Sequence, residues 1–348
     1  MQDARQKNLF WTPIFNLTLV YHSVIDEDLM ADISPQQVET LYQEAWQALR
    51  DENVVEAMAK SDALIKLKQE SGYQLKVMLL LEADRLPEAL DLVQEGVEAQ
   101  PDSWSLALLY TDLLSLDGQG EEALKIIENT RELEGVESHW VDISEATVRG
   151  RMMDIDQALN LLQKIEHPDA INAAIEMQFA LLDSVGRHDL IIEVAEEDLS
   201  LLEAPEDANE AAVLSRIMSQ VAQAYWYEEE DEDTVEHYLE LSIAYDRSNP
   251  DALYLRRELD GLFSEQSRTF ELELRGVWEG DHEESAEEKP YQTHYQVIAD
   301  SEEEALALIQ SYEPKHLSGP AMKIVQSRSE PNPEEELKGV YLVSPLDF

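Results

Sequence analysis

Apolar residues recur at helical spacing from about residue 38 to residue 263, in segments that come in pairs separated by short polar turns. Four alanines, Ala57, Ala89, Ala123 and Ala158, each lie early in the second segment of a pair, 32, 34 and 35 residues apart. A side chain this small lets two helices cross closely. Because one helical hairpin cannot bury its own apolar face, this period predicts hairpins stacked into a solenoid.

The pair over Tyr73–Pro101 is the most regular copy of the pattern. Pro87 stands in the first turn of its second helix, where the missing N–H is harmless, and Pro101 follows Ala89 by 12 residues. This arrangement resembles the tetratricopeptide-repeat family, whose pattern has a small residue early in the second helix and a closing proline. The resemblance covers roughly residues 35–265. It implies that the first helices of the repeats line a concave groove that holds a peptide or helix.

Later copies match less well. Ile191 stands where the fifth copy should have alanine, and the sixth copy follows it by 44 residues, which indicates an insertion near residues 203–209. A terminal helix from Pro250 to Phe263 is predicted to cap the array. The sequence therefore predicts five or six helix pairs over residues 35–266.

After Phe263 the apolar pattern changes from helical spacing to strict alternation. Phe270, Leu272 and Leu274 alternate with charged residues, as in a half-buried strand. Further strands are predicted over 291–299, 322–325 and 340–343, with a helix that begins after Ser301. We expect a mainly α protein in which a tetratricopeptide-like solenoid is followed by a small α+β domain, β-β-α-β-β, over residues 267–348. The latter resembles no family that we identify.

The N-terminal segment, residues 1–34, repeats the alternation at Phe15, Leu17 and Leu19. We hypothesise that residues 12–22 form a strand that pairs with the C-terminal sheet, the alternative being a flexible lead-in. The longest apolar stretch, residues 8–25, is too polar for a transmembrane helix, and no cleavage site of a signal peptide follows it. The expected location is cytoplasmic.

The chain is strongly acidic, with 75 acidic and 25 basic residues and a formal net charge of -50. This sign argues against binding to nucleic acid or to anionic membranes, which need a basic surface. The charge is spread along the chain, since residues 268–348 hold 18 acidic and 7 basic residues and the rest hold 57 and 18. Three interpretations stay open: adaptation to high salt, a generally acidic protein, or an acidic mimic of nucleic acid.

Sequence motifs for catalysis are absent. The chain has no cysteine, no phosphate-binding glycine loop, no G-x-S-x-G and no H-E-x-x-H, and its eight histidines include no i, i+4 pair. The acidic run Glu228–Asp233 lacks the glycine and ligand spacing of a calcium loop and is interpreted as a turn. We expect no enzyme activity, no cofactor and no metal.

Partner contacts are predicted at aromatic and cationic residues of the first helices, because tyrosine, tryptophan and arginine dominate binding hot spots. The candidates are Tyr73, Lys76, Trp104, Trp140, Arg149, Arg216, Tyr225 and Trp226. For the aromatic rings, packing in the core is the alternative. The expected function is a non-catalytic protein-interaction scaffold whose partner is basic or apolar-helical. The alternative is an acidic inhibitor, immunity-type protein or nucleic-acid mimic that masks a basic surface.

Overall fold

The computed structural model describes residues 35–50, 53–202, 204–205, 207–229, 232–278, 289–314, 317, 322–332 and 336–346. The chain forms two compact units, one up to Leu181 and one from Leu182 onward. The predicted strand over residues 12–22 lies outside the described residues, so its pairing with the C-terminal sheet stays a prediction.

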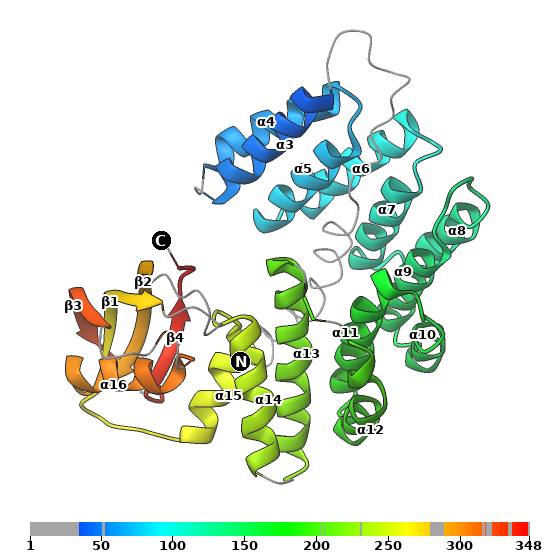
Figure 1. The fold of residues 1–348 in the computed structure, drawn as a ribbon. Helices are drawn as coiled ribbons and strands as arrows, with labels where there is room; N and C mark the ends of the chain where they lie inside the picture. Colours follow the sequence, from blue (N-terminus) through cyan, green and yellow to red (C-terminus); the bar gives the residue numbers. More distant parts are fainter. Residues whose placement is uncertain are drawn as a thin grey trace. The chain divides into compact units, whose positions relative to one another are not determined.

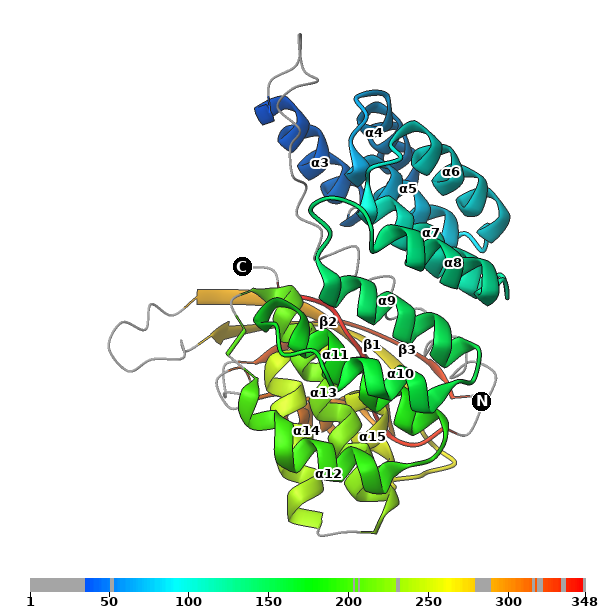
Figure 2. The same ribbon diagram turned by 90° about the vertical axis from the view of Figure 1, so that its right-hand side faces the viewer.

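The first unit is an array of helices that pack in sequence order (Figures 1 and 2). Each first helix of a pair packs on its own second helix, and α5 also contacts α7, as α7 contacts α9. The predicted solenoid of helix pairs is confirmed. The helices are α3 (Pro35–Arg50), α4 (Val54–Lys66), α5 (Glu70–Glu82), α6 (Leu86–Ala99), α7 (Trp104–Leu116), α8 (Gly120–Thr130), α9 (Ser138–Arg151), α10 (Ile155–Leu162) and α11 (Pro168–Ser184), the last of which runs into the second unit.

The alanine ladder lies where the helices cross. The four alanines at positions 57, 89, 123 and 158 are all completely buried. Gly72 of α5 meets α4 even more closely, because a Cβ atom added there would lie 2.7 Å from Cβ of Leu64. Helix starts are fixed locally, as at Ser103, whose hydroxyl accepts a hydrogen bond from N–H of Leu106. Small residues and caps thus set the spacing of the array.

The second unit joins the last helices to a four-stranded antiparallel sheet with strand order β3-β1-β2-β4. The predicted β-β-α-β-β order is confirmed. Its elements are α12 (His188–Asp198), η2 (Leu199–Leu201), α13 (Ala208–Tyr227), α14 (Glu232–Tyr245), α15 (Pro250–Asp260), β1 (Arg268–Trp278), β2 (Lys289–Ala299), α16 (Glu302–Tyr312), β3 (Lys323–Pro331) and β4 (Gly339–Val343).

The predicted end of the terminal helix is wrong. The helix α15 ends at Asp260, because Gly261 takes a left-handed conformation with φ 55° and closes the helix. Leu262 and Phe263, which the apolar pattern placed on the helix, lie beyond it and are 42% and 50% exposed. The helix α15 therefore ends before the run of apolar residues at helical spacing does.

One hydrophobic core connects the last helices to the sheet. Leu239 of α14 and Leu255 of α15 belong to the same buried cluster as Leu272 of β1, Val297 of β2 and Ile309 of α16. The helix α16 covers one face of the sheet, and the alternation of β1 buries its apolar side chains on that face. Division of the chain at residues 266/267 stays a prediction, and it would cut through this shared core.

Candidate partner-binding surfaces

Two of the predicted contact residues are part of the core. Tyr73 is 4% exposed and Trp140 is 2% exposed. Tyr73 lies against Gly96, where an added Cβ atom would come within 3.0 Å of its ring, and Nε1 of Trp140 donates a hydrogen bond to Glu137 over 3.1 Å. Their burial favours the alternative of core packing, so neither ring offers a surface to a partner.

The predicted cations of α5 and α9 already have partners within the chain. Nζ of Lys76 lies 2.6 Å from Asp62, and the guanidinium of Arg149 contacts Glu145 at 2.7 Å and Asp154 at 3.2 Å. Pairs of this kind neutralise the positive charge that an acidic peptide would need. Lys76 and Arg149 therefore have less positive charge to offer an acidic chain end.

The remaining candidates are half-buried and belong to two helices, one in each unit. Trp104 lies on α7 against the core around Trp140, whereas Arg216, Tyr225 and Trp226 lie on α13. The ring of Tyr225 stacks on Tyr238 of α14 with 5.7 Å between centroids and 13° between planes. Tyr225 and Trp226 both pack against the core of the second unit. Partner contacts at these four residues stay a prediction.

A hollow of about 500 Å³ opens between α4, α5 and α6 in the first unit. We call it the α4–α6 groove. Apolar side chains alternate in it with charged ones that project from α5 and α6. The residues that line it are Met58, Lys76, Leu80, Arg85, Glu88, Asp91, Leu92 and Glu95. Lys76 is the only one of the predicted contact residues that lines this groove. Most of the lining comes from the second helices α4 and α6, whereas the sequence predicts a groove lined by first helices.

Sequence reasoning missed the contribution of α6 although a signal was present. Glu88, Asp91, Leu92 and Glu95 follow i, i+3, i+4, i+7 spacing and so share one face of the helix. The neighbouring face, about 100° round the helix, carries Ala89, Val93 and Gly96, all buried. This pattern is typical of any amphipathic helix at a protein surface. It does not show that α6 lines a groove unless the packing of the neighbouring helices is known.

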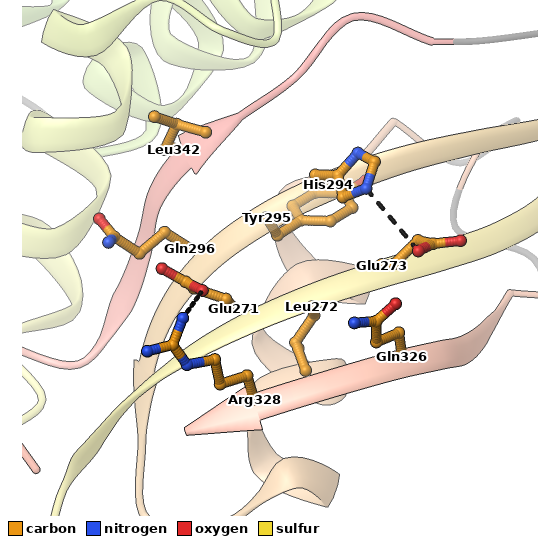
Figure 3. Close-up of a pocket in the computed structure, with 9 residues that line it drawn as sticks. All are labelled: Glu271, Leu272, Glu273, His294, Tyr295, Gln296, Gln326, Arg328 and Leu342. Atoms are coloured by element: carbon orange, nitrogen blue, oxygen red, sulfur yellow. Dashed lines mark ion pairs between the residues drawn. The ribbon is translucent and has the colours of Figure 1, made fainter. Parts of the chain in front are cut away.

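A second hollow, of about 430 Å³, lies on the face of the sheet that α16 leaves open (Figure 3). Its exposed groups form two loose ion pairs, Arg328 with Glu271 at 3.8 Å and His294 with Glu273 at 3.9 Å. Leu342 of β4 is 54% exposed at its rim. The lining residues are Glu271, Leu272, Glu273, His294, Tyr295, Gln296, Gln326, Arg328 and Leu342. Its lining holds two carboxylates, one guanidinium and one imidazole, and Arg328 also pairs with Glu330 at 2.6 Å, so it is a mixed polar surface.

Groups able to hold a metal were sought in the described ranges. No cluster of three or more histidine, aspartate or glutamate side chains there has the arrangement of a metal site. None of the helices in the described part of the chain is both long enough and apolar enough to cross a bilayer.

A buried titratable pair in the first unit is formed by Asp112 of α7 and Arg151 of α9. The side chain of Asp112 is completely buried, and burial raises the pKa of its carboxyl to about 7 although the charge of nearby Arg151 opposes the shift. Nη1 of Arg151 donates a hydrogen bond to the carbonyl oxygen of Asp112 over 3.1 Å. The pair connects α7 to the end of α9, so it belongs to the packing of the array.

No model of a known protein family matches the chain, and no curated protein matches it. Solved structures resemble it in part. YrrB, described as a tetratricopeptide-repeat protein with an unusual peptide-binding site, is 18% identical, with a TM-score of 0.31 over 56% of this chain and 96% of its own. PilW, a type IV pilus biogenesis factor, is 13% identical, with a TM-score of 0.40 over 64% of this chain and 100% of its own.

A tetratricopeptide-repeat protein from Parabacteroides merdae is 14% identical, with a TM-score of 0.25 over 60% of this chain and 99% of its own. The chain thus resembles tetratricopeptide-repeat proteins, as its sequence predicts.

Proposed function

We propose that this protein is a non-catalytic scaffold that holds a peptide or helix of another protein on its array of helix pairs. The observation that carries the proposal is the α4–α6 groove, an open hollow of about 500 Å³ in which the half-buried side chains of Met58 and Leu92 provide an apolar surface between charged walls. An apolar floor with a polar rim is the usual composition of a site for a protein segment.

The partner is basic or apolar-helical. The charge of -50 attracts cationic partners and repels acidic ones, which governs the rate of association more than its affinity. The cytoplasmic location and the absence of catalysis belong to this proposal. The same net charge supports the second candidate, an acidic inhibitor or mimic that covers a basic surface.

Capture of a partner at two salt concentrations separates the two candidates. The full chain is used as bait, and a captured protein is purified and added back while amide hydrogen exchange is followed. A scaffold predicts protection concentrated in α4, α5 and α6 and retained at high salt. A mimic predicts protection spread over acidic surfaces and binding that falls steeply with salt. If the purified partner protects no helix of the array, the scaffold proposal is wrong.

A further inference from the structure

The walls of the α4–α6 groove carry negative charge that the chain does not neutralise. Arg85 forms an ion pair with Glu88, with Nε and Oε1 2.7 Å apart, and Lys76 forms one with Asp62. Within the described part of the chain, Asp91 and Glu95 form no ion pair, and both are exposed. The helix α6 itself contains no lysine or arginine. The groove is therefore left with two carboxylates whose charge is available to a ligand.

The position of these carboxylates is fixed by close packing below them. Gly96 lets α6 approach the buried ring of Tyr73 so closely that an added Cβ atom would lie 3.0 Å from Cδ1. Burial raises the pKa of Tyr73, and the carboxylate of Glu95 adds to the shift. The pKa of Tyr110 on α7 is also raised. Burial is the largest cause, and the carboxylates of Glu122, Glu98 and Asp91 add to it. Glu95 and Asp91 are thus near enough to the tyrosines beside α6 to raise the pKa of their hydroxyls.

The spacing of the two carboxylates matches a helical ligand. Asp91 and Glu95 are i and i+4 on α6, so they lie about 6 Å apart along the groove. A second helix laid along α6 repeats its own side chains at the same interval. The half-buried apolar side chains of Met58 and Leu92 lie beside this acidic row and suit the apolar face of such a helix.

We propose that the α4–α6 groove binds an amphipathic helix that places two arginines or lysines, one turn apart, on Asp91 and Glu95, and its apolar face on Met58 and Leu92. This inference rests on the proposed scaffold function and names the chemistry of the partner. An acidic or purely apolar helix leaves the two carboxylates without counter-charges. A nucleic acid is repelled by the same carboxylates.

The probe is a synthetic amphipathic helix of roughly 18 residues with arginines at i and i+4 beside a leucine face. Its affinity for the full chain is measured by fluorescence anisotropy at low and high salt. The variant Asp91→Lys/Glu95→Lys is expected to weaken binding at least about tenfold at low salt and less at high salt. A probe with glutamates in place of the arginines should regain affinity for that variant, which excludes misfolding as the cause.

The matched control is Glu193→Lys/Glu197→Lys, an exposed i, i+4 pair on α12 that changes the net charge by the same amount. This control is expected to change the affinity for the probe by less than about threefold, because charges far from a contact contribute little to it. Equal losses in the two variants would mean that the general field attracts the probe, and the inference would be overturned. A natural partner that protects α4–α6 but binds the Asp91/Glu95 variant unchanged would leave the scaffold function standing and overturn only this inference.

Discussion

Arg247 and Glu313 form a buried ion pair that fastens the last helix pair to the sheet. Arg247 follows α14, and its guanidinium contacts the carboxylate of Glu313, beside the end of α16, with Nη2 and Oε1 2.6 Å apart. The side chain of Glu313 is completely buried, and the hydroxyl of Tyr295 donates a second hydrogen bond to it over 2.9 Å. The pair joins segments that are 66 residues apart in the sequence.

Replacement of Arg247 by methionine should destabilise the second unit strongly. It leaves the carboxylate of Glu313 buried without its counter-charge, and removal of one partner of a buried pair costs about 3–5 kcal/mol. Hydrogen exchange of the β1 and β2 amides measures the loss. The double variant Arg247→Met/Glu313→Leu should be more stable than the single variant, because it removes both charges. Equal exchange in wild type and the single variant would show that the pair contributes nothing.

Gly72→Ala should destabilise the first unit although alanine favours helices by about 1 kcal/mol. The added Cβ atom would lie 2.7 Å from Cβ of Leu64 and from the backbone nitrogen of Ile65, so α4 and α5 must separate. Overpacking of this kind costs about 1–3 kcal/mol. Urea unfolding of the variant measures the balance of the two effects.

Gly120→Ala is the matched control for this crossing. An added Cβ atom there meets only the side chain of Met152, which is 39% exposed and can move away. Its effect on stability should be smaller than that of Gly72→Ala. A more stable Gly72→Ala variant would show that α4 and α5 are not in close contact at this point.

The helix ladder could be predicted from sequence because its signals are local. Ala57 and Ala89 recur at a fixed period, and Pro87 and Gly118 mark the turns beside them. The end of α15 was predicted wrongly because the apolar pattern continues past the turn, whereas the left-handed conformation of Gly261 ends the helix.

The candidate site was harder to predict because it depends on the packing of three helices. Periodicity does not reveal which face of α5 meets its neighbours, so it could not decide between a partner contact and core packing for Tyr73, which is buried against α6. For the same reason the pairing of Lys76 with Asp62 of α4 could not be foreseen, and a partner contact at Lys76 stays a prediction. Asp91 and Glu95 looked like ordinary solvated charges.

Salt should stabilise this protein. At a net charge of -50 the folded chain repels itself, and raising NaCl from about 0.1 M to about 1 M shortens the Debye length from roughly 10 Å to roughly 3 Å. The midpoint of thermal unfolding should rise by about 5 °C or more over this range. An uncharged osmolyte of equal osmolality serves as the control for exclusion effects. A midpoint that falls with NaCl would argue against adaptation to high salt.

The stability of the first unit should depend on pH through Asp112. Burial of this side chain raises the pKa of its carboxyl to about 7, against about 3.9 in an unfolded chain, although the charge of Arg151 and a hydrogen bond from Ser144 oppose the shift. The folded state therefore binds the proton more tightly than the unfolded state. Its contribution to stability is complete below about pH 4 and is lost as pH rises through 7.

Asp112→Asn, which keeps the shape of the neutral acid, should remove this dependence. As the pH rises from 5 to 8, the free energy of unfolding of the wild type should fall by roughly 3 kcal/mol more than that of the variant. This follows from the pKa of about 7 that Asp112 has in the folded state. Urea unfolding at several pH values measures the difference, and the titration of all other carboxylates cancels in it. Parallel pH profiles would mean that Asp112 stays charged over this range and that Arg151, which donates to its carbonyl oxygen, compensates its burial.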